Sequence, residues 1–328
     1  MLNIGLLGAG RIGITHARAV SALPDARITA VFDPVDAAAE AAQALTGARR
    51  ASVEDILADE TIAAVIVATP TDLHASQVEQ AARAGKAIFC EKPIDLSSAR
   101  AEACLAVVRE QKAKLMLGFN RRFDPSFARL KAEVEAGVIG KVELVQITSR
   151  DPAPPPVDYI RRSGGLFRDM MIHDFDMARF LLGEEVTEVF ATGSALVDPA
   201  IGGAGDVDTA TATLRTASGR IAVITNSRRA TYGYDQRIEV HGEKGMIQAG
   251  NQTATTLTRA SAAGFTSDPL LDFFMQRYAE AYRLELAAFC RYAAGEDIAV
   301  PTGEDGLAAL KLADAAVASL TSGQSVKL

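Results

Sequence analysis

Residues 2–13 of this chain read LNIGLLGAGRIG. The apolar run at 3–7 predicts a β-strand, and the apolar spacing over 12–21 predicts an α-helix directly after it. In a turn of this kind the first glycine allows the tight bend, the second lets a pyrophosphate approach the backbone, and the third lets helix and strand pack closely. The segment therefore predicts a dinucleotide-binding turn made of Gly8, Ala9, Gly10, Arg11, Ile12 and Gly13.

An acidic residue follows the next predicted strand, which covers residues 27–32. Asp33 lies roughly 20 residues after the last glycine of the turn, where a carboxylate accepts hydrogen bonds from both ribose hydroxyls and repels a 2′-phosphate. Arg11 is the one nearby residue that would favour NADP, and we interpret it as a solvated charge over the diphosphate. NAD is therefore the expected cofactor.

Short apolar runs alternate with longer helical patterns up to about residue 118. The predicted strands cover residues 3–7, 27–32, 63–68, 87–90 and 114–118, and the predicted helices cover 12–21, 34–45, 74–84 and 97–112. The run at 63–68 is apolar throughout, as in a parallel strand that is covered on both faces. Strands that alternate with helices imply right-handed crossovers and a doubly wound parallel sheet.

The pattern changes near residue 120, so we predict two α/β domains at 1–119 and 120–328. The second domain should hold a strand at 142–148, a proline-rich loop at 151–156, and helices at 166–182, 273–294 and 304–322. Alternating segments at 209–215, 220–226, 236–241 and 245–249 predict an antiparallel sheet with two different faces. One face would pack on helices, and the other would be solvated or meet another subunit.

Composition narrows the class of protein. Hydrophobic residues make up 48% of the chain and charged residues 23%, which is ordinary for a globular enzyme. The net charge of −7 argues against nucleic-acid binding, which needs a basic face. No basic leader or membrane-length apolar stretch is present, and the three cysteines lack metal-ligand spacing. We therefore expect a cytoplasmic protein with reduced thiols and no membrane partner.

The strand at 63–68 ends in Thr69 and Pro70. Ligands of open α/β sheets bind at the carboxyl ends of the strands, so both residues should border the cofactor. His74 starts the following helix and is expected to be a cap or a cofactor contact, with a catalytic role as the alternative.

The segment Glu91-Lys92-Pro93 follows the strand at 87–90, at the same sheet edge as the glycine turn. A lysine held there would polarise a hydroxyl or carbonyl oxygen and stabilise a developing alkoxide. Pro93 restricts the backbone around Lys92 and so aims the ammonium group. The alternative is a surface lysine in a turn.

Residues 164–176 read GGLFRDMMIHDFD. Asp169 and His173 are four apart, so we expect both on one helix face. Imidazole, with a reference pKa of about 6.5, suits the removal of a hydroxyl proton, and a carboxylate one turn away would orient the ring. A metal site with Asp176 as a third ligand, or a purely structural capping role, are the alternatives. No full coordination set is evident, so no metal is expected.

Together the glycine turn, Glu91-Lys92-Pro93 and the 164–176 segment resemble the Gfo/Idh/MocA oxidoreductases, in order and spacing, over essentially the whole chain. Within that family, the segments at 118–124, 148–152 and 232–236 are similar to the inositol dehydrogenases. One departure is Met171, where a glycine is common.

The resemblance implies a Rossmann domain followed by an α/β domain with a large, mostly antiparallel open sheet that often builds a homotetramer. It implies Lys92, Asp169 and His173 as the catalytic set, with His173 as the base, and Glu91 and Lys92 beside the cofactor. The implied polyol contacts are Asn120, Arg122, Arg150 and Tyr234.

The implied reaction is oxidation of myo-inositol to 2-keto-myo-inositol (scyllo-inosose), with hydride transfer to NAD. Alternatives are a dehydrogenase for another inositol isomer, glucose or a keto-sugar, a non-catalytic NAD-binding sugar sensor, and an enzyme that uses NAD transiently to cleave glycosides. Sensors of this kind typically lack the lysine and the histidine, and both are present here.

Overall fold

The computed structural model describes all 328 residues and divides the chain into two compact units. The first unit contains Met1–Phe123 together with Ala279–Leu310, and the second contains Asp124–Tyr278 together with Lys311–Leu328. The predicted division assigned everything after residue 119 to the second domain. Ala279–Leu310 returns to the first unit because its helix α12 packs on α1 and places Phe289 against Phe89.

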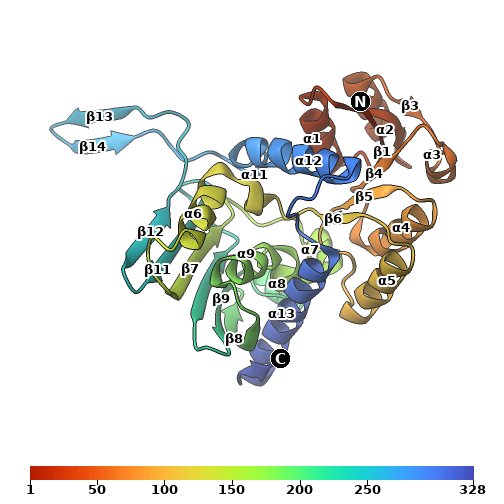
Figure 1. The fold of residues 1–328 in the computed structure, drawn as a ribbon. Coiled ribbons are helices and arrows are strands. Elements are labelled where there is room, and N and C mark those ends of the chain that lie inside the picture. The colour runs from red at the N-terminus through yellow and green to blue at the C-terminus, as the bar shows by residue number, and fades with distance from the viewer. The chain divides into compact units, whose positions relative to one another are not determined.

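The first unit is built on a six-stranded sheet in the order β3-β2-β1-β4-β5-β6, with every neighbouring pair parallel (Figure 1). The predicted doubly wound parallel sheet is confirmed. Its strands are β1 Leu2–Leu7, β2 Ala26–Phe32, β3 Arg49–Arg50, β4 Ala64–Val67, β5 Ala87–Cys90 and β6 Leu115–Leu117. Its helices are α1 Arg11–Ser21, α2 Asp36–Thr46, α3 Val53–Ala58, α4 Thr71–Arg83, α5 Ser98–Glu110, the 3₁₀ helix η1 Asn120–Phe123 and α12 Ala279–Ala294.

The second unit is built on a seven-stranded sheet in the order β12-β11-β7-β10-β9-β8-β15. Only the β7–β10 pair is parallel, so the predicted mostly antiparallel sheet is confirmed. Its strands are β7 Val142–Arg150, β8 Val186–Ser194, β9 Thr209–Thr216, β10 Ile221–Ser227, β11 Asp235–Gly242, β12 Gly245–Ala249 and β15 Val326–Lys327. Its helices are α6 Pro125–Glu135, α7 Val157–Ser163, α8 Gly165–Asp169, α9 Ile172–Leu182, α10 Pro199–Gly203 and α11 Phe274–Arg277. Helix α13, Gly303–Ser322, contains the division between the units.

The two faces of the seven-stranded sheet differ, as the period-2 alternation predicts. Ser149 on β7 is buried and hydrogen-bonded to Asp174 of α9, and the β8 amide of Ala191 donates to Ser319 of α13, so helices cover this face. On the other face Phe190 and Ile221 are exposed. A separate hairpin of β13 (Thr258–Ser261) and β14 (Gly264–Ser267) extends away from the sheet and is exposed throughout (Figure 1).

Two predicted helices are each interrupted in the structure. Residues 166–182 form α8 and α9, because the amides of Met170 and Met171 both donate to the carbonyl of Leu166, and the helical pattern restarts on the Met171 carbonyl. Residues 273–294 form α11 and α12, with Tyr278 outside the helical backbone region between them. Neither break involves a proline or glycine, so no local sequence signal marks it.

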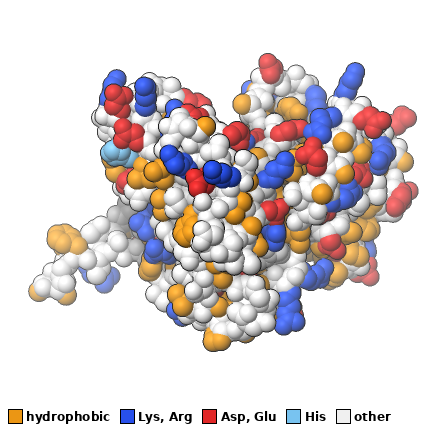
Figure 2. All heavy atoms as spheres, turned by 90° about the horizontal axis from the view of Figure 1, so that it is seen from below, with side chains coloured by type: hydrophobic (Ala, Val, Ile, Leu, Met, Phe, Trp, Pro, Cys, Tyr) orange, Lys and Arg blue, Asp and Glu red, His pale blue; other side chains and the backbone are white.

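The length and polarity of the helices and the distribution of surface charge can be compared with the composition. No helix of this chain combines the length and apolar character needed to cross a bilayer. On the face shown in Figure 2, basic and acidic side chains are interspersed rather than gathered into areas of one sign.

Candidate active site

The three glycines of the turn between β1 and α1 differ in the space around them. Gly8 has φ +93°, and a Cβ there would lie 2.5 Å from the Ala68 carbonyl oxygen. A Cβ on Gly13 would lie 2.1 Å from the Gly8 carbonyl oxygen, whereas a Cβ on Gly10 would meet nothing within 4 Å. Gly8 and Gly13 are thus required by the protein's own packing. Gly10 borders open space at the N-terminus of α1, where free amides can hold a diphosphate.

Asp33 stands at the carboxyl end of β2 with both carboxylate oxygens oriented by the backbone. Its Oδ2 accepts from the Ala9 amide at 2.7 Å and its Oδ1 from the Val35 amide at 2.8 Å. Beside it is a pocket of about 320 Å³, lined by Val31, Phe32, Asp33, Arg50, Ala51 and Ser52. The carboxylate is thereby held at the rim of a pocket at the expected adenosine end of a dinucleotide.

The end of β4 lies directly beside the glycine turn, since the backbone of Ala68 and Thr69 contacts Gly8. Pro70 precedes α4 and occupies its N-cap position. His74 is buried in the first turn of α4, with Nε2 2.7 Å from the Thr69 carbonyl oxygen and Nδ1 2.8 Å from that of Pro93. Both ring nitrogens of His74 are therefore engaged by backbone, which leaves neither for the expected cofactor contact.

Lys92 follows β5 and is half-buried, with a cis peptide bond to Pro93. The amide of Glu91 donates to the Val67 carbonyl at 2.9 Å, which places this segment at the same sheet edge as the glycine turn. The Glu91 carboxylate, predicted to lie beside the cofactor, is buried and contacts His16 Nε2 at 2.7 Å. His16 was missed by sequence reasoning because its partner is 75 residues away.

The two expected polyol contacts of the first unit lie in η1. Asn120 is buried, and Arg122 is half-buried. Arg122 Nη2 forms an ion pair with Asp305 Oδ1 of α13 at 3.1 Å. The guanidinium is thus oriented by a carboxylate that the sequence analysis did not single out.

In the second unit, Asp169 and His173 do not share one helix. Asp169 ends α8 and His173 is the second residue of α9, so the helical i,i+4 geometry predicted for them is wrong. Asp169 Oδ1 accepts from the Tyr159 hydroxyl at 3.0 Å, and its Oδ2 lies 3.5 Å from Nη2 of the buried Arg228. Sequence reasoning missed Tyr159 and Arg228, because only tertiary packing brings them to Asp169.

The other acids of the 164–176 segment are buried. Asp174 accepts from Ser149 Oγ at 2.6 Å and from Asn226 Nδ2 at 2.8 Å, which ties α9 to β7 and β10. No group of three or more His, Cys, Asp or Glu side chains in the chain is placed to hold a metal ion, including at Asp176. Asp174 therefore sets the position of the helix that carries His173.

Arg150 and Tyr234, the remaining expected polyol contacts, lie in different surroundings. Tyr234 is buried against Phe273 and Tyr278.

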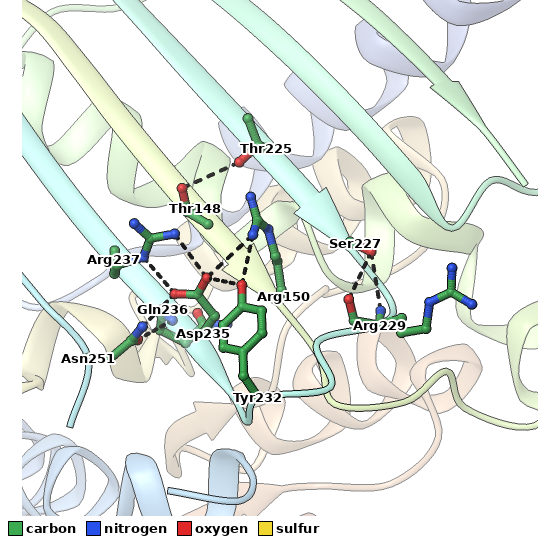
Figure 3. Close-up of polar contacts among 10 residues, drawn as sticks. All are labelled: Thr148, Arg150, Thr225, Ser227, Arg229, Tyr232, Asp235, Gln236, Arg237 and Asn251. Carbon is green, nitrogen blue, oxygen red and sulfur yellow. Dashed lines mark hydrogen bonds and ion pairs between the residues drawn. The ribbon is translucent and has the colours of Figure 1, made fainter. Parts of the chain in front are cut away.

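Arg150 follows the inward-facing Ser149 and so points to the uncovered face of the sheet, where it meets Tyr232 and Asp235 (Figure 3). Arg237 and Asn251 complete this cluster around the Asp235 carboxylate, whose hydrogen bonds hold its pKa below the usual value although burial raises it.

Two family models match this chain. Residues 2–119 match the model of the oxidoreductase family with an NAD-binding Rossmann fold, and residues 127–248 match that of the GFO/IDH/MocA C-terminal domain. The chain belongs to the Gfo/Idh/MocA oxidoreductase family, and its first domain is an NAD-binding Rossmann domain.

Individual relatives narrow the comparison. The chain is 57% identical to the inositol 2-dehydrogenase of Rhizobium meliloti, over 100% of this chain and 99% of the relative. It is similar to the crystal structure of a myo-inositol dehydrogenase from Corynebacterium glutamicum (TM-score 0.96, 42% identity, 100% and 99% covered). It also resembles a scyllo-inositol dehydrogenase from Lactobacillus casei with bound NAD(H) and scyllo-inositol (TM-score 0.92, 31% identity, 100% and 99% covered).

Proposed function

We propose that this chain is an inositol 2-dehydrogenase that oxidises one secondary hydroxyl of myo-inositol to a ketone, giving 2-keto-myo-inositol (scyllo-inosose). The observation that carries the proposal is the 57% identity over the full chain to an inositol 2-dehydrogenase. When bound at the glycine turn, NAD supplies the hydride acceptor. The sequence retains the lysine, aspartate and histidine that such a reaction needs.

The three proposed catalytic residues divide the work of removing a proton while a ketone forms. His173 accepts the hydroxyl proton, and a positioned general base contributes roughly 10²–10⁴-fold. Lys92 stabilises the negative charge that develops on the oxygen. We assign Asp169 the role of orienting the catalytic groups, and its own carboxylate is held by Tyr159 and Arg228.

We assign the remaining polyol hydroxyls to Asn120, Arg122 and Tyr234. Amide, guanidinium and phenol groups offer the several donors and acceptors that a polyol requires at defined angles. Arg150 is left out of this set because its side chain points to the sheet face opposite α9. We propose Gly8, Ala9, Gly10, Arg11, Ile12, Gly13, Asp33, Thr69, Pro70 and Lys92 as the cofactor contacts.

We further propose a cytoplasmic homotetramer. The uncovered face of the seven-stranded sheet, with Phe190 and Ile221 exposed on it, supports a contact between subunits. All three cysteines are free thiols, which fits a reducing compartment. Light scattering of the purified chain measures the assembly directly.

The test of the reaction is a panel of initial rates with NAD on myo-inositol, scyllo-inositol, another inositol isomer and glucose, followed by NADH absorbance. We expect myo-inositol to give the highest kcat/KM. A rate with glucose equal to that with myo-inositol would contradict the proposal. The absence of net NADH would favour glycoside cleavage with transient use of the cofactor, because that chemistry returns the hydride.

The second candidate is a scyllo-inositol dehydrogenase, which the similarity to the Lactobacillus casei enzyme favours. The two inositols differ in the orientation of one hydroxyl, so the same panel separates them.

Asp33→Ala tests the cofactor preference. This substitution should weaken NAD binding and relax discrimination against NADP, since the carboxylate no longer meets the ribose hydroxyls.

A further inference from the structure

Two buried histidines contact the residues that precede and follow Lys92 in the sequence. His16 is three residues beyond the last glycine of the cofactor turn, and its side chain is fully buried with Nε2 2.7 Å from Glu91 Oε1. Its ring lies edge-on to Phe89 and Tyr282, with centroids 5.0 and 5.6 Å away. Burying a carboxylate and an imidazole costs free energy unless they pair, and a glutamate in a turn can remain in water. The burial of Glu91 against His16 therefore indicates that the pair has a specific role in this part of the fold.

The pairing locks the residue that precedes Lys92. The Glu91 amide donates to Val67 on β4, and its carboxylate is held by His16 of α1. A Cβ on Gly118 would lie 3.2 Å from that carboxylate, so the glycine at the end of β6 makes room for it. Glu91 is thus anchored to the neighbouring strands and to the helix that begins at the cofactor turn.

His74 locks the residue that follows Lys92. Its Nδ1 contacts the Pro93 carbonyl at 2.8 Å, and its Nε2 contacts the Thr69 carbonyl at 2.7 Å. Carbonyl oxygens only accept hydrogen bonds, so the ring nitrogen that carries the proton is the donor. Thr69 in turn donates from Oγ1 to Gln77 at 2.7 Å and contacts the backbone of Gly8.

We propose that His16 and His74 are positioning residues for Lys92. His16 connects the residue before the lysine to the helix of the glycine turn, and His74 connects the residue after it to the β4 end that touches Gly8. The elements that are proposed to hold the dinucleotide therefore also fix the backbone from which the Lys92 side chain extends. The inference rests on the proposed function, in which Lys92 stabilises the oxygen of the reacting hydroxyl.

The test compares His16→Leu and His74→Leu with His16→Gln, which keeps a donor near the Nε2 position. His241→Leu is the matched control, because His241 is an exposed histidine of β11 in the second unit. The measurements are kcat and KM, the NADH dissociation constant from fluorescence, and hydrogen exchange of peptides that cover residues 90–94. NADH binding and exchange report on the histidines without any substrate.

For the two leucine variants we expect kcat to fall about 10–100-fold, since a displacement of about 1 Å of a catalytic group costs this much. The NADH dissociation constant should stay near that of the wild type, because no proposed cofactor contact is removed. Exchange at 90–94 should rise while exchange in β4 is unchanged. His16→Gln should recover most of kcat, and His241→Leu should match the wild type.

Unchanged kcat in both leucine variants would overturn the proposal. So would a joint loss of thermal stability, NADH affinity and kcat that His16→Gln does not repair, because that describes a structural role alone. If the wild type does not oxidise myo-inositol, the proposed function fails. The exchange and NADH measurements then still decide the role of the histidines, with kcat taken on whichever polyol of the panel reacts.

Discussion

The two sheets of this chain present their functional groups in different ways. In the six-stranded sheet the strands are parallel, so their carboxyl ends meet at one edge, and Gly8, Asp33, Thr69 and Lys92 all lie just after a strand. In the seven-stranded sheet the proposed base sits instead on α9, one of the helices that cover a face of the sheet.

The difference shows where each kind of site gets its geometry. A residue after a parallel strand is placed by the strand itself, so a few local residues define it. His173 and Asp169 depend on side chains far along the chain, such as Ser149, Asn226 and Arg228. We therefore expect substitutions in the glycine turn to act mainly on cofactor binding or local packing, and substitutions around α9 to act on the proposed base and on the pairs that hold it.

The largest effect is expected from His173→Ala. Removal of the general base should lower kcat about 10²–10⁴-fold while the NADH dissociation constant stays near that of the wild type. Stopped-flow rates and NADH fluorescence measure the two quantities. An equal loss of NADH affinity would mean that the residue belongs to the cofactor site, and the contrast between the units would fail.

Asp124→Ala tests the dependence of the second unit on distant pairs. Asp124 caps α6 and forms a buried ion pair with Arg277 of α11, and both side chains are almost fully excluded from water. Loss of one partner leaves a buried charge unpaired, so the free energy of unfolding should fall by about 3–5 kcal/mol. Urea denaturation measures it. Asp198→Ala, which removes an exposed cap of α10, is the control and should cost only about 0.5–2 kcal/mol.

The glycines of the turn allow a sharper comparison within the first unit. Gly13→Ala should lower the free energy of unfolding by about 1–3 kcal/mol, because the added methyl group clashes with the Gly8 carbonyl and overpacks the turn. Gly10→Ala should leave stability near the wild type and weaken NADH about tenfold or more, since its methyl group enters the space of the diphosphate. Two variants with the same profile would contradict these separate roles.

The last prediction concerns the thiols, whose effect is confined to alkaline pH. Burial raises the pKa of Cys104 to about 12 and of Cys290 to about 11, and raises that of Cys90 well above its usual value. The folded state therefore holds thiol protons that the unfolded state releases above about pH 9, so these groups leave stability unaffected below that pH and lower it between pH 9 and 12. Denaturation midpoints across this range measure the loss. Rapid alkylation of the native thiols at neutral pH would count against it.

Much of the fold follows from local sequence. The strand at 87–90 has the predicted bounds, and the other predicted strands and helices of the first domain differ by a few residues at their ends. Helix α6 went unpredicted although Asp124 and Pro125 form a recognisable start signal, an aspartate cap followed by proline at the first turn. The return of α12 to the first unit follows from aromatic contacts that no periodicity records.

For the proposed site, the sequence by itself pointed to the residues whose proposed role comes from backbone geometry: the glycine turn, Asp33 after β2, and Lys92 before Pro93. It also supplied His173 and Asp169, but in the wrong helical relation. Only the tertiary structure decided which distant side chains contact this site. Arg228 and Tyr159 contact Asp169, His16 contacts Glu91, and His74 contacts the Pro93 carbonyl. Turn geometry depends on neighbours in sequence, whereas the pairing of buried polar groups depends on which distant segments the packed core brings together.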